Sequence, residues 1–164
     1  MTGASIDRYV PHRGAMSLLD TVTAADDASI AARLTVRDDG LFETSDGVPV
    51  LLTVEYMAQA VAAFAGARSL ARDDPVQLGL LLGVRSFVAA APYLVPGDAL
   101  EVTATLVLES ATGLAVFDCR VTNAGEIVAS ARLTVLRIDS LDDLQKTVAD
   151  SSAGGRSTVE PTNG

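Results

Sequence analysis

The stretch GVPVLLTVEYMAQAVAAFAG, residues 47–66, predicts a long and largely apolar helix. From Thr53 to about Leu70 the apolar residues recur at helical spacing, and no proline interrupts them. Many of the side chains are alanine, so a sheet could approach this helix closely. Glu55 and Gln59 stand inside the apolar run, four residues apart and therefore on one face of the helix. This pair of polar side chains makes that face the first candidate for a functional site.

On both sides of the helix the pattern changes to the period of two that is typical of half-buried strands. The alternation is clearest over residues 99–110, and a turn signal at 123–125 joins two later segments. The other candidate strands are residues 28–36, 77–89, 114–122 and 126–138. The sequence therefore predicts an α+β fold in which a curved antiparallel sheet wraps around one central helix. Such a sheet leaves open edges, so we expect at least a dimer.

Length and composition predict one globular domain followed by a polar tail. A chain of 164 residues, 49% of them hydrophobic, can form one core and is short for two. We place the domain at residues 1–140. Residues 141–164 are mostly polar and rich in glycine towards their end, so we interpret them as a flexible tail that cannot bury enough surface to offset its ordering entropy.

Charge and composition disfavour several classes of function. The net charge of −9 opposes binding to nucleic acid, although an acidic carrier protein could still dock on a local cluster of arginines. One histidine, His12, and one cysteine, Cys119, leave no set of metal ligands of the usual kind and no internal disulfide. Cys119 lies in an alternating apolar segment, where we expect a buried and inert thiol. No glycine-rich phosphate-binding motif is present.

The sequence favours a cytoplasmic protein without a membrane span. The N-terminal residues lack the basic start and apolar stretch of a secretory signal. Residues 48–66 are long and apolar enough to suggest a transmembrane helix. However, Glu55 near the middle of this stretch would cost about 3 kcal/mol on insertion, and Gln59 is polar as well.

Three separated motifs resemble those of the hotdog-fold 3-hydroxyacyl-acyl-carrier-protein dehydratases, the FabZ-like superfamily. They are VPHRGAMSLLDTV at 10–22, VEYMAQA at 54–60 and FVAAAPYLVPGDAL at 87–100. The resemblance is closest to the ApeP-like dehydratases of aryl polyene clusters and spans about residues 8–138. It implies a hotdog fold and a 3-hydroxyacyl thioester substrate, carried on acyl carrier protein or on CoA. The phosphopantetheine arm would arrive with the substrate, so no further cofactor is implied.

The same resemblance implies roles for individual residues. Glu55 matches the catalytic carboxylate of the family, and Gln59 follows it on the face that would look into an acyl-thioester tunnel. The position whose backbone N–H holds the thioester carbonyl is Val50, which follows Pro49. The family histidine lies fourteen residues before the carboxylate, and counting back without a gap gives Leu41, which cannot transfer a proton.

Dehydration of such a thioester needs a base for the C2 proton and an acid for the departing hydroxyl. A carboxyl group in an apolar pocket can keep the proton that the acid must donate, so Glu55 suits that role. His12 is the sole imidazole and is a candidate base, as is a histidine from a partner subunit. If His12 is the base, its ring must lie within about 8 Å of the Glu55 carboxyl.

Each candidate residue also has a purely structural alternative. Glu55 could cap the helix start or pair with a surface arginine. His12 could hydrogen-bond the backbone at a sheet edge, and a buried Gln59 could be satisfied by backbone groups. Arg13 could bind a carrier phosphate or pair with a neighbouring carboxylate.

Two other functions stay open on the sequence alone. A hotdog acyl-thioesterase would use the helix carboxylate to attack or activate water without any histidine. A supporting subunit would form a heterodimeric dehydratase with a second hotdog chain that supplies the missing histidine. A homodimer is the expected assembly, and the heterodimer is the alternative.

Overall fold

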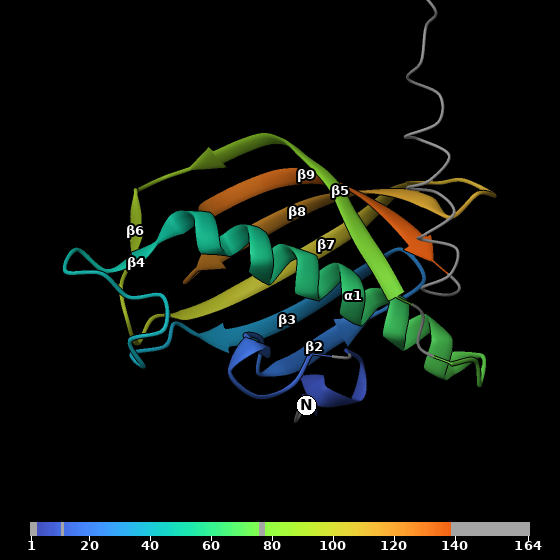
Figure 1. Cartoon of the computed structure of the whole chain (residues 1–164), viewed down its shortest axis with the longest axis horizontal. Coiled ribbons are helices and arrows are strands. Elements are labelled where there is room, and N and C mark those ends of the chain that lie inside the picture. Colours follow the sequence, from blue (N-terminus) through green and yellow to red (C-terminus); the bar gives the residue numbers. More distant parts are fainter. Residues whose placement is uncertain (1–2, 11, 76–77, 139–164) are drawn as a thin grey trace, which may run out of the picture.

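A seven-stranded antiparallel sheet wraps around the long helix α1 (Thr53–Ala71), as Figure 1 shows. The computed structural model describes residues 3–10, 12–75 and 78–138. The expected tail at 141–164 lies outside these residues, as do the last two residues of the expected domain. The sheet order is β1-β2-β3-β7-β8-β9-β5. Its strands are β1 Ala4–Ser5, β2 Thr21–Ala25, β3 Ser29–Thr35, β5 Leu78–Ala89, β7 Ala99–Glu109, β8 Leu114–Asn123 and β9 Glu126–Ile138.

Shorter elements complete the described part of the chain. A separate two-stranded sheet pairs β4 (Val48–Pro49) with β6 (Tyr93–Leu94). Short 3-10 turns occupy Ile6–Arg8, Gly14–Met16 and Val50–Leu52, and the last of these leads directly into α1. The α+β hotdog architecture predicted from the sequence is therefore confirmed.

The alternating segments form strands because one face of each packs on α1. In β7 the side chains of Leu100, Val102 and Ala104 are buried, while the residues between them are only half-buried. The β8–β9 hairpin closes at Ala124 and Gly125, both with positive φ, as the turn signal predicted. These strands curve around the helix and bury it against the sheet.

Helix α1 is the core of the fold. Tyr56, Met57 and Phe64 are almost completely buried, together with several of the alanines. The residues Val50–Ala71 are long and apolar enough to cross a membrane, but in this structure the helix packs against the strands of the sheet. It is a buried core helix and not a membrane span.

The N-terminal segment crosses α1 at a very close approach. A Cβ atom on Gly66 would collide with the backbone carbonyl oxygen of Tyr9. Only glycine therefore lets the backbone of residues 9–10 lie directly on the helix. This contact brings the following loop, which carries His12, towards the helix face that holds Glu55.

Candidate active site

Glu55 and His12 face each other across a short gap. The distance from His12 Nε2 to Glu55 Oε1 is 3.9 Å, well inside the limit of about 8 Å set for an acid and base that share one thioester. Because 3.9 Å is longer than a hydrogen bond, the imidazole and the carboxyl group are close neighbours that are not bonded to each other. Their side chains are 33% and 37% exposed, which is consistent with a site open to a substrate.

The other ring nitrogen of His12, Nδ1, has different surroundings from Nε2. Its Nδ1 is buried and has no hydrogen-bond partner among the residues that the structure describes. The ring nitrogen that approaches Glu55 Oε1 is Nε2. The alternative of a structural histidine satisfied by backbone groups is not what the described contacts show.

Gln59 joins the helix to the loop that follows His12. Its Nε2 donates to Glu55 Oε1 at 2.9 Å and to the carbonyl of Met16 at 2.7 Å, and its Oε1 accepts from Leu18 N–H at 2.9 Å. The side chain is completely buried. Both interpretations of Gln59 therefore hold at once, because it orients Glu55 and is also satisfied by backbone groups.

Two arginines fix the same loop. The Arg37 guanidinium donates to the carbonyl oxygens of Ala15 and Ser17. Arg13 donates to the carbonyl of its neighbour His12 at 2.7 Å and to that of Val10. Arg13 lines neither of the cavities described below, so the structure places it as a brace of the loop and not beside the carboxyl group.

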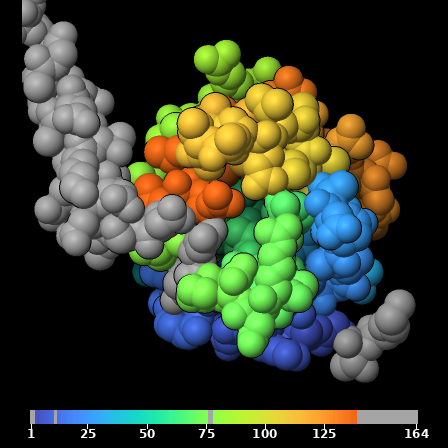
Figure 2. Space-filling view, turned by 90° about the vertical axis from the view of Figure 1, so that its right-hand side faces the viewer, coloured from blue at the N-terminus to red at the C-terminus, as the bar shows by residue number. Residues whose placement is uncertain are grey.

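A groove of about 590 Å³ begins at Glu55 and His12 and runs along α1. Successive turns of the helix supply small residues to its floor, and strands β5, β7, β8 and β9 supply its walls. Figure 2 views the molecule from the end at which α1 finishes. The helix residues that line the groove are Glu55, Ala58, Val61, Ala62, Phe64, Ala65, Arg68 and Ser69, and Arg72 follows just after the helix end.

A second, more open cavity of about 400 Å³ is also lined by Glu55. Apart from Glu55, its lining is apolar, and it consists of Phe42, Pro49, Leu51, Leu52 and Val54. Glu55 is the residue common to both cavities.

The expected oxyanion donor is engaged elsewhere. The backbone N–H of Val50 donates to the carbonyl of Pro92 at 2.9 Å, next to the β4–β6 pairing of Pro49 with Tyr93. This corrects the expectation of a free amide at Val50, because a donor held in that bond does not point at a substrate oxygen. Pro49 does line the second cavity.

Leu41, at the position counted for the family histidine, is 48% exposed and lines neither cavity. Its neighbour Phe42 lines the second cavity instead. Residues 41–42 therefore lie near Glu55, and the side chain that they place in the lining of the second cavity, that of Phe42, is apolar.

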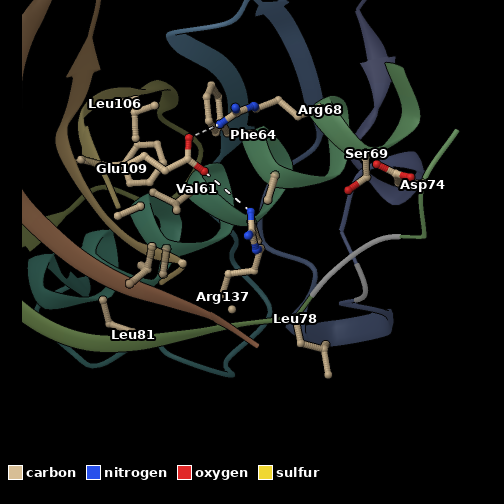
Figure 3. Close-up of a pocket in the computed structure, with 18 of the residues that line it drawn as sticks. Val61, Phe64, Arg68, Ser69, Asp74, Leu78, Leu81, Leu106, Glu109 and Arg137 are labelled. Atoms are coloured by element: carbon tan, nitrogen blue, oxygen red, sulfur yellow. Dashed lines mark hydrogen bonds and ion pairs between the residues drawn. The ribbon is translucent and has the colours of Figure 1, made fainter. Parts of the chain in front are cut away.

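Charged residues that the sequence did not single out close the far end of the groove. Arg68 Nη1 lies 2.8 Å from Glu109 Oε2, and Arg137 Nη1 lies 3.8 Å from Glu109 Oε1 (Figure 3). The three residues come from α1, β7 and β9, which are far apart in the chain. Only the pairing of these strands around the helix brings them together, so spacing in the sequence gave no signal.

Other titratable groups in the core lie outside this chemistry. Burial raises the pKa of the Cys119 thiol to about 12, and Cys119 is almost fully buried, as expected for an inert thiol. Burial also raises the pKa of the Tyr56 hydroxyl to about 12. Among the described residues, no group of three or more histidine, cysteine, aspartate or glutamate side chains could hold a metal ion.

Comparison with known proteins places this site in a sequence family. The chain matches the ApeP-like family, described as ApeP dehydratase, over residues 4–148. The 3-hydroxyacyl-[acyl-carrier-protein] dehydratase FabZ of Streptococcus pyogenes serotype M3 is 30% identical over 134 residues. That alignment covers 79% of this chain and 93% of the relative.

Solved structures agree with the fold. A chain of the dehydratase heterocomplex ApeI:P from Xenorhabdus doucetiae is 27% identical with a TM-score of 0.80, and the match covers 87% of this chain and 97% of that chain. A hypothetical thioesterase with coenzyme A from Streptococcus pneumoniae is 17% identical with a TM-score of 0.57, covering 71% of this chain and 84% of that one. The second likeness concerns the fold alone.

Proposed function

Because the chain belongs to the ApeP-like dehydratase family, we propose that it removes water from a 3-hydroxyacyl thioester with Glu55 and His12 as its acid and base. Its function is of the 3-hydroxyacyl-[acyl-carrier-protein] dehydratase type, as both the family and the FabZ relative indicate. The observation that carries the residue assignment is the 3.9 Å approach of the imidazole to the carboxyl group at the head of the groove.

In the proposed reaction, neutral His12 accepts the proton from C2 and protonated Glu55 donates its proton to the C3 hydroxyl. The C2–H electron pair forms the C2–C3 double bond, and the hydroxyl leaves as water. The products are a trans-2-enoyl thioester, an imidazolium and a carboxylate. The two charged groups then lie close enough to stabilise each other, and transfer of the proton from His12 to Glu55 restores the starting state.

Gln59 is a positioning residue in this proposal. Its N–H group donates to Glu55 Oε1, which leaves the other carboxyl oxygen to carry and donate the proton. Its remaining hydrogen bonds tie the loop after His12 to the same helix turn. One buried side chain thereby sets the position of both reacting groups.

A second hotdog subunit is part of the proposal. Strand β5 forms an edge of the sheet, and its apolar side chains are exposed, with Leu82 54% and Val88 64% accessible. An exposed apolar edge strand is a template for pairing with another chain. A solved relative is itself a heterocomplex, so the partner could be a different hotdog chain that supplies a further histidine in place of Leu41. A homodimer is the alternative.

The substrate is proposed to be carried on acyl carrier protein, as in the printed name of the FabZ relative. The cytoplasm is the expected location, since α1 is a core helix of the fold.

The function is tested by incubating the full chain, alone and with any hotdog partner that co-purifies with it, with a 3-hydroxyacyl carrier protein. Mass spectrometry of the carrier should show loss of one water from the acyl group. Release of free carrier thiol without dehydration would instead identify a thioesterase and contradict the proposal.

A further inference from the structure

Arg37 binds the chain just after His12 through both of its terminal nitrogens. Nη1 donates to the carbonyl of Ala15 at 2.9 Å, and Nη2 donates to the carbonyl of Ser17. Asp39 is also near, but its Oδ2 lies 4.0 Å from Nη1 and both side chains are partly exposed, so this ion pair contributes little. Among the described residues, the two backbone carbonyls are therefore the main partners of the guanidinium.

The contacts of Arg37 alternate with those of Gln59 along residues 15–18. The carbonyl of Met16 lies between the two that Arg37 binds, and it accepts from Gln59 Nε2. The Leu18 N–H donates to Gln59 Oε1. Gln59 is completely buried, whereas the Arg37 side chain is partly exposed. One side chain from the interior and one that reaches solvent thus hold the same four residues.

The side chain of Arg37 starts from a well-defined point of the sheet. Arg37 comes two residues after the end of β3, and the preceding Val36 is buried. The Val36 N–H donates to the carbonyl of Asp98 at 2.9 Å, and the Val36 carbonyl accepts from the Gly97 N–H at 2.8 Å. Because both backbone groups of Val36 are bonded, the sheet fixes the place from which Arg37 extends.

His12 lies between two anchored parts of the chain. On its N-terminal side the backbone of Tyr9 lies directly on α1 at Gly66. On its C-terminal side the contacts of Arg37 begin three residues later. Neither ring nitrogen of His12 forms a hydrogen bond among the described residues. Hydrogen bonds of its own therefore do not fix the ring, and its place depends on the backbone that carries it.

We propose that Arg37 is a positioning residue for the base, because its two hydrogen bonds hold the segment after His12 and so keep the imidazole opposite Glu55. A guanidinium suits this task, since its planar fork directs two separate nitrogens at two carbonyls. Lysine carries the same charge on one nitrogen and cannot hold both carbonyls in the same geometry. This inference rests on the proposed function, because it takes His12 to be the base.

The first test measures the place of His12 in the full chain, in the assembly that it forms, and uses no turnover. His12 is the sole histidine, so the NMR signals of its ring protons are assigned without ambiguity. In wild type they should show a nuclear Overhauser effect to the side-chain protons of Glu55, since the imidazole and the carboxyl group approach to 3.9 Å. Arg37→Gln removes both hydrogen bonds to the segment, and the effect should be lost.

The second test measures turnover of a 3-hydroxyacyl carrier protein by the same samples. Arg37→Gln should lower kcat at least roughly tenfold, because a misplacement of about 1 Å between reacting groups can cost more than that. KM should change less, since Arg37 lines neither cavity. Arg37→Lys keeps the charge and should lower kcat by a smaller factor. It also decides the question if Arg37→Gln does not fold.

Arg33→Gln is the matched control. Arg33 lies four residues earlier, on β3, where its side chain is largely exposed and pairs with Glu101. The variant removes the same charge from the same part of the chain without touching a carbonyl of residues 15–18. It should keep both the Overhauser effect and the kcat of wild type.

All variants are measured at a temperature where each is fully folded, so that a loss of stability alone does not lower kcat. The proposal is overturned if the Arg37 variants keep the Overhauser effect and kcat of wild type, or if Arg33→Gln loses as much. A fall in kcat with an unchanged Overhauser effect would also overturn it, because the imidazole would not have moved.

Failure of the proposed function has a different signature. If Arg37→Gln lost the Overhauser effect but kept its kcat, His12 would not be the base, although Arg37 would still be the residue that places its ring. If wild type dehydrated no thioester at all, the proposed function would fall, and the Overhauser effect would still decide whether Arg37 holds His12 opposite Glu55.

Discussion

At the scale of single residues, Gln59 links both halves of the candidate site. It is the side chain that contacts Glu55 and the loop carrying His12 at the same time. The Gln59 side chain itself is completely buried, and an unpaired polar group in such a position is costly. One carboxamide therefore joins Glu55, the proposed acid, to the segment that follows His12, the proposed base.

Replacing Gln59 with methionine should destabilise the fold by roughly 2 to 4 kcal/mol, because Leu18 N–H and the Met16 carbonyl lose their buried partner. Turnover of the remaining folded protein should fall as well, since His12 is no longer held opposite Glu55. Denaturant unfolding and rate measurements on the same samples check both effects. Met57→Leu is the control, as Met57 is equally buried on this helix but makes no such link, and it should cost less than about 1.5 kcal/mol.

The sequence was sufficient to predict Glu55, Gln59 and His12 as candidate site residues. Glu55 and Gln59 are polar residues within an apolar run, and His12 is the sole histidine of the chain. It did not predict where the hydrogen bonds go. The Val50 amide was expected to be free, but its N–H donates a hydrogen bond to the carbonyl of Pro92, some forty residues later. Arg68, Glu109 and Arg137 were missed because they meet only after three separate elements pack together.

At the scale of elements, α1 and the long strands formed as the periodicity predicted. Helix α1 ends one residue beyond the expected boundary, and β9 matches the predicted range of 126–138. The short strands β1, β2, β4 and β6 were not predicted, since two to five residues are too few to show a period. They form because neighbouring segments offer backbone partners.

Gly66→Ala tests the crossing of the N-terminal segment over α1. In an exposed helix position this change would add about 1 kcal/mol of stability. Here the new methyl group meets the Tyr9 carbonyl, and overpacking against backbone costs roughly 1 to 3 kcal/mol or more. We expect a net loss in the free energy of unfolding and a displaced His12 loop.

Gly79→Ala is the matched control for that variant, because a Cβ there would meet no atom within 4 Å. Its unfolding free energy should stay within about 1 kcal/mol of wild type. A Gly66→Ala protein that is as stable as wild type would show that the N-terminal segment does not lie against the helix as described.

At the scale of the whole molecule, strand β5 is an edge of the sheet, and among the described residues no further strand pairs with its outer side. Lysine in place of Val88 or Leu82 should shift the assembly towards monomer, because a charge on that edge opposes pairing with another strand. Both side chains are exposed in the single chain, so its folding should be little affected. Analytical ultracentrifugation measures the shift.

Val107→Lys provides the comparison, since Val107 is also exposed but lies on β7, in the interior of the sheet order. It should leave the assembly state unchanged. If the β5 variants assembled like wild type, the partner would have to bind a different surface.

The central claim is that the Glu55 carboxyl group donates the proton that carries the hydroxyl away. The most direct measurement is the rate at which the Glu55→Gln variant, in the complex that the wild-type protein forms, dehydrates a 3-hydroxyacyl carrier protein. We predict a fall of at least roughly 100-fold, with an unfolding free energy within about 0.5 kcal/mol of wild type. A rate within about twofold of wild type would contradict the claim, because an amide cannot supply that proton.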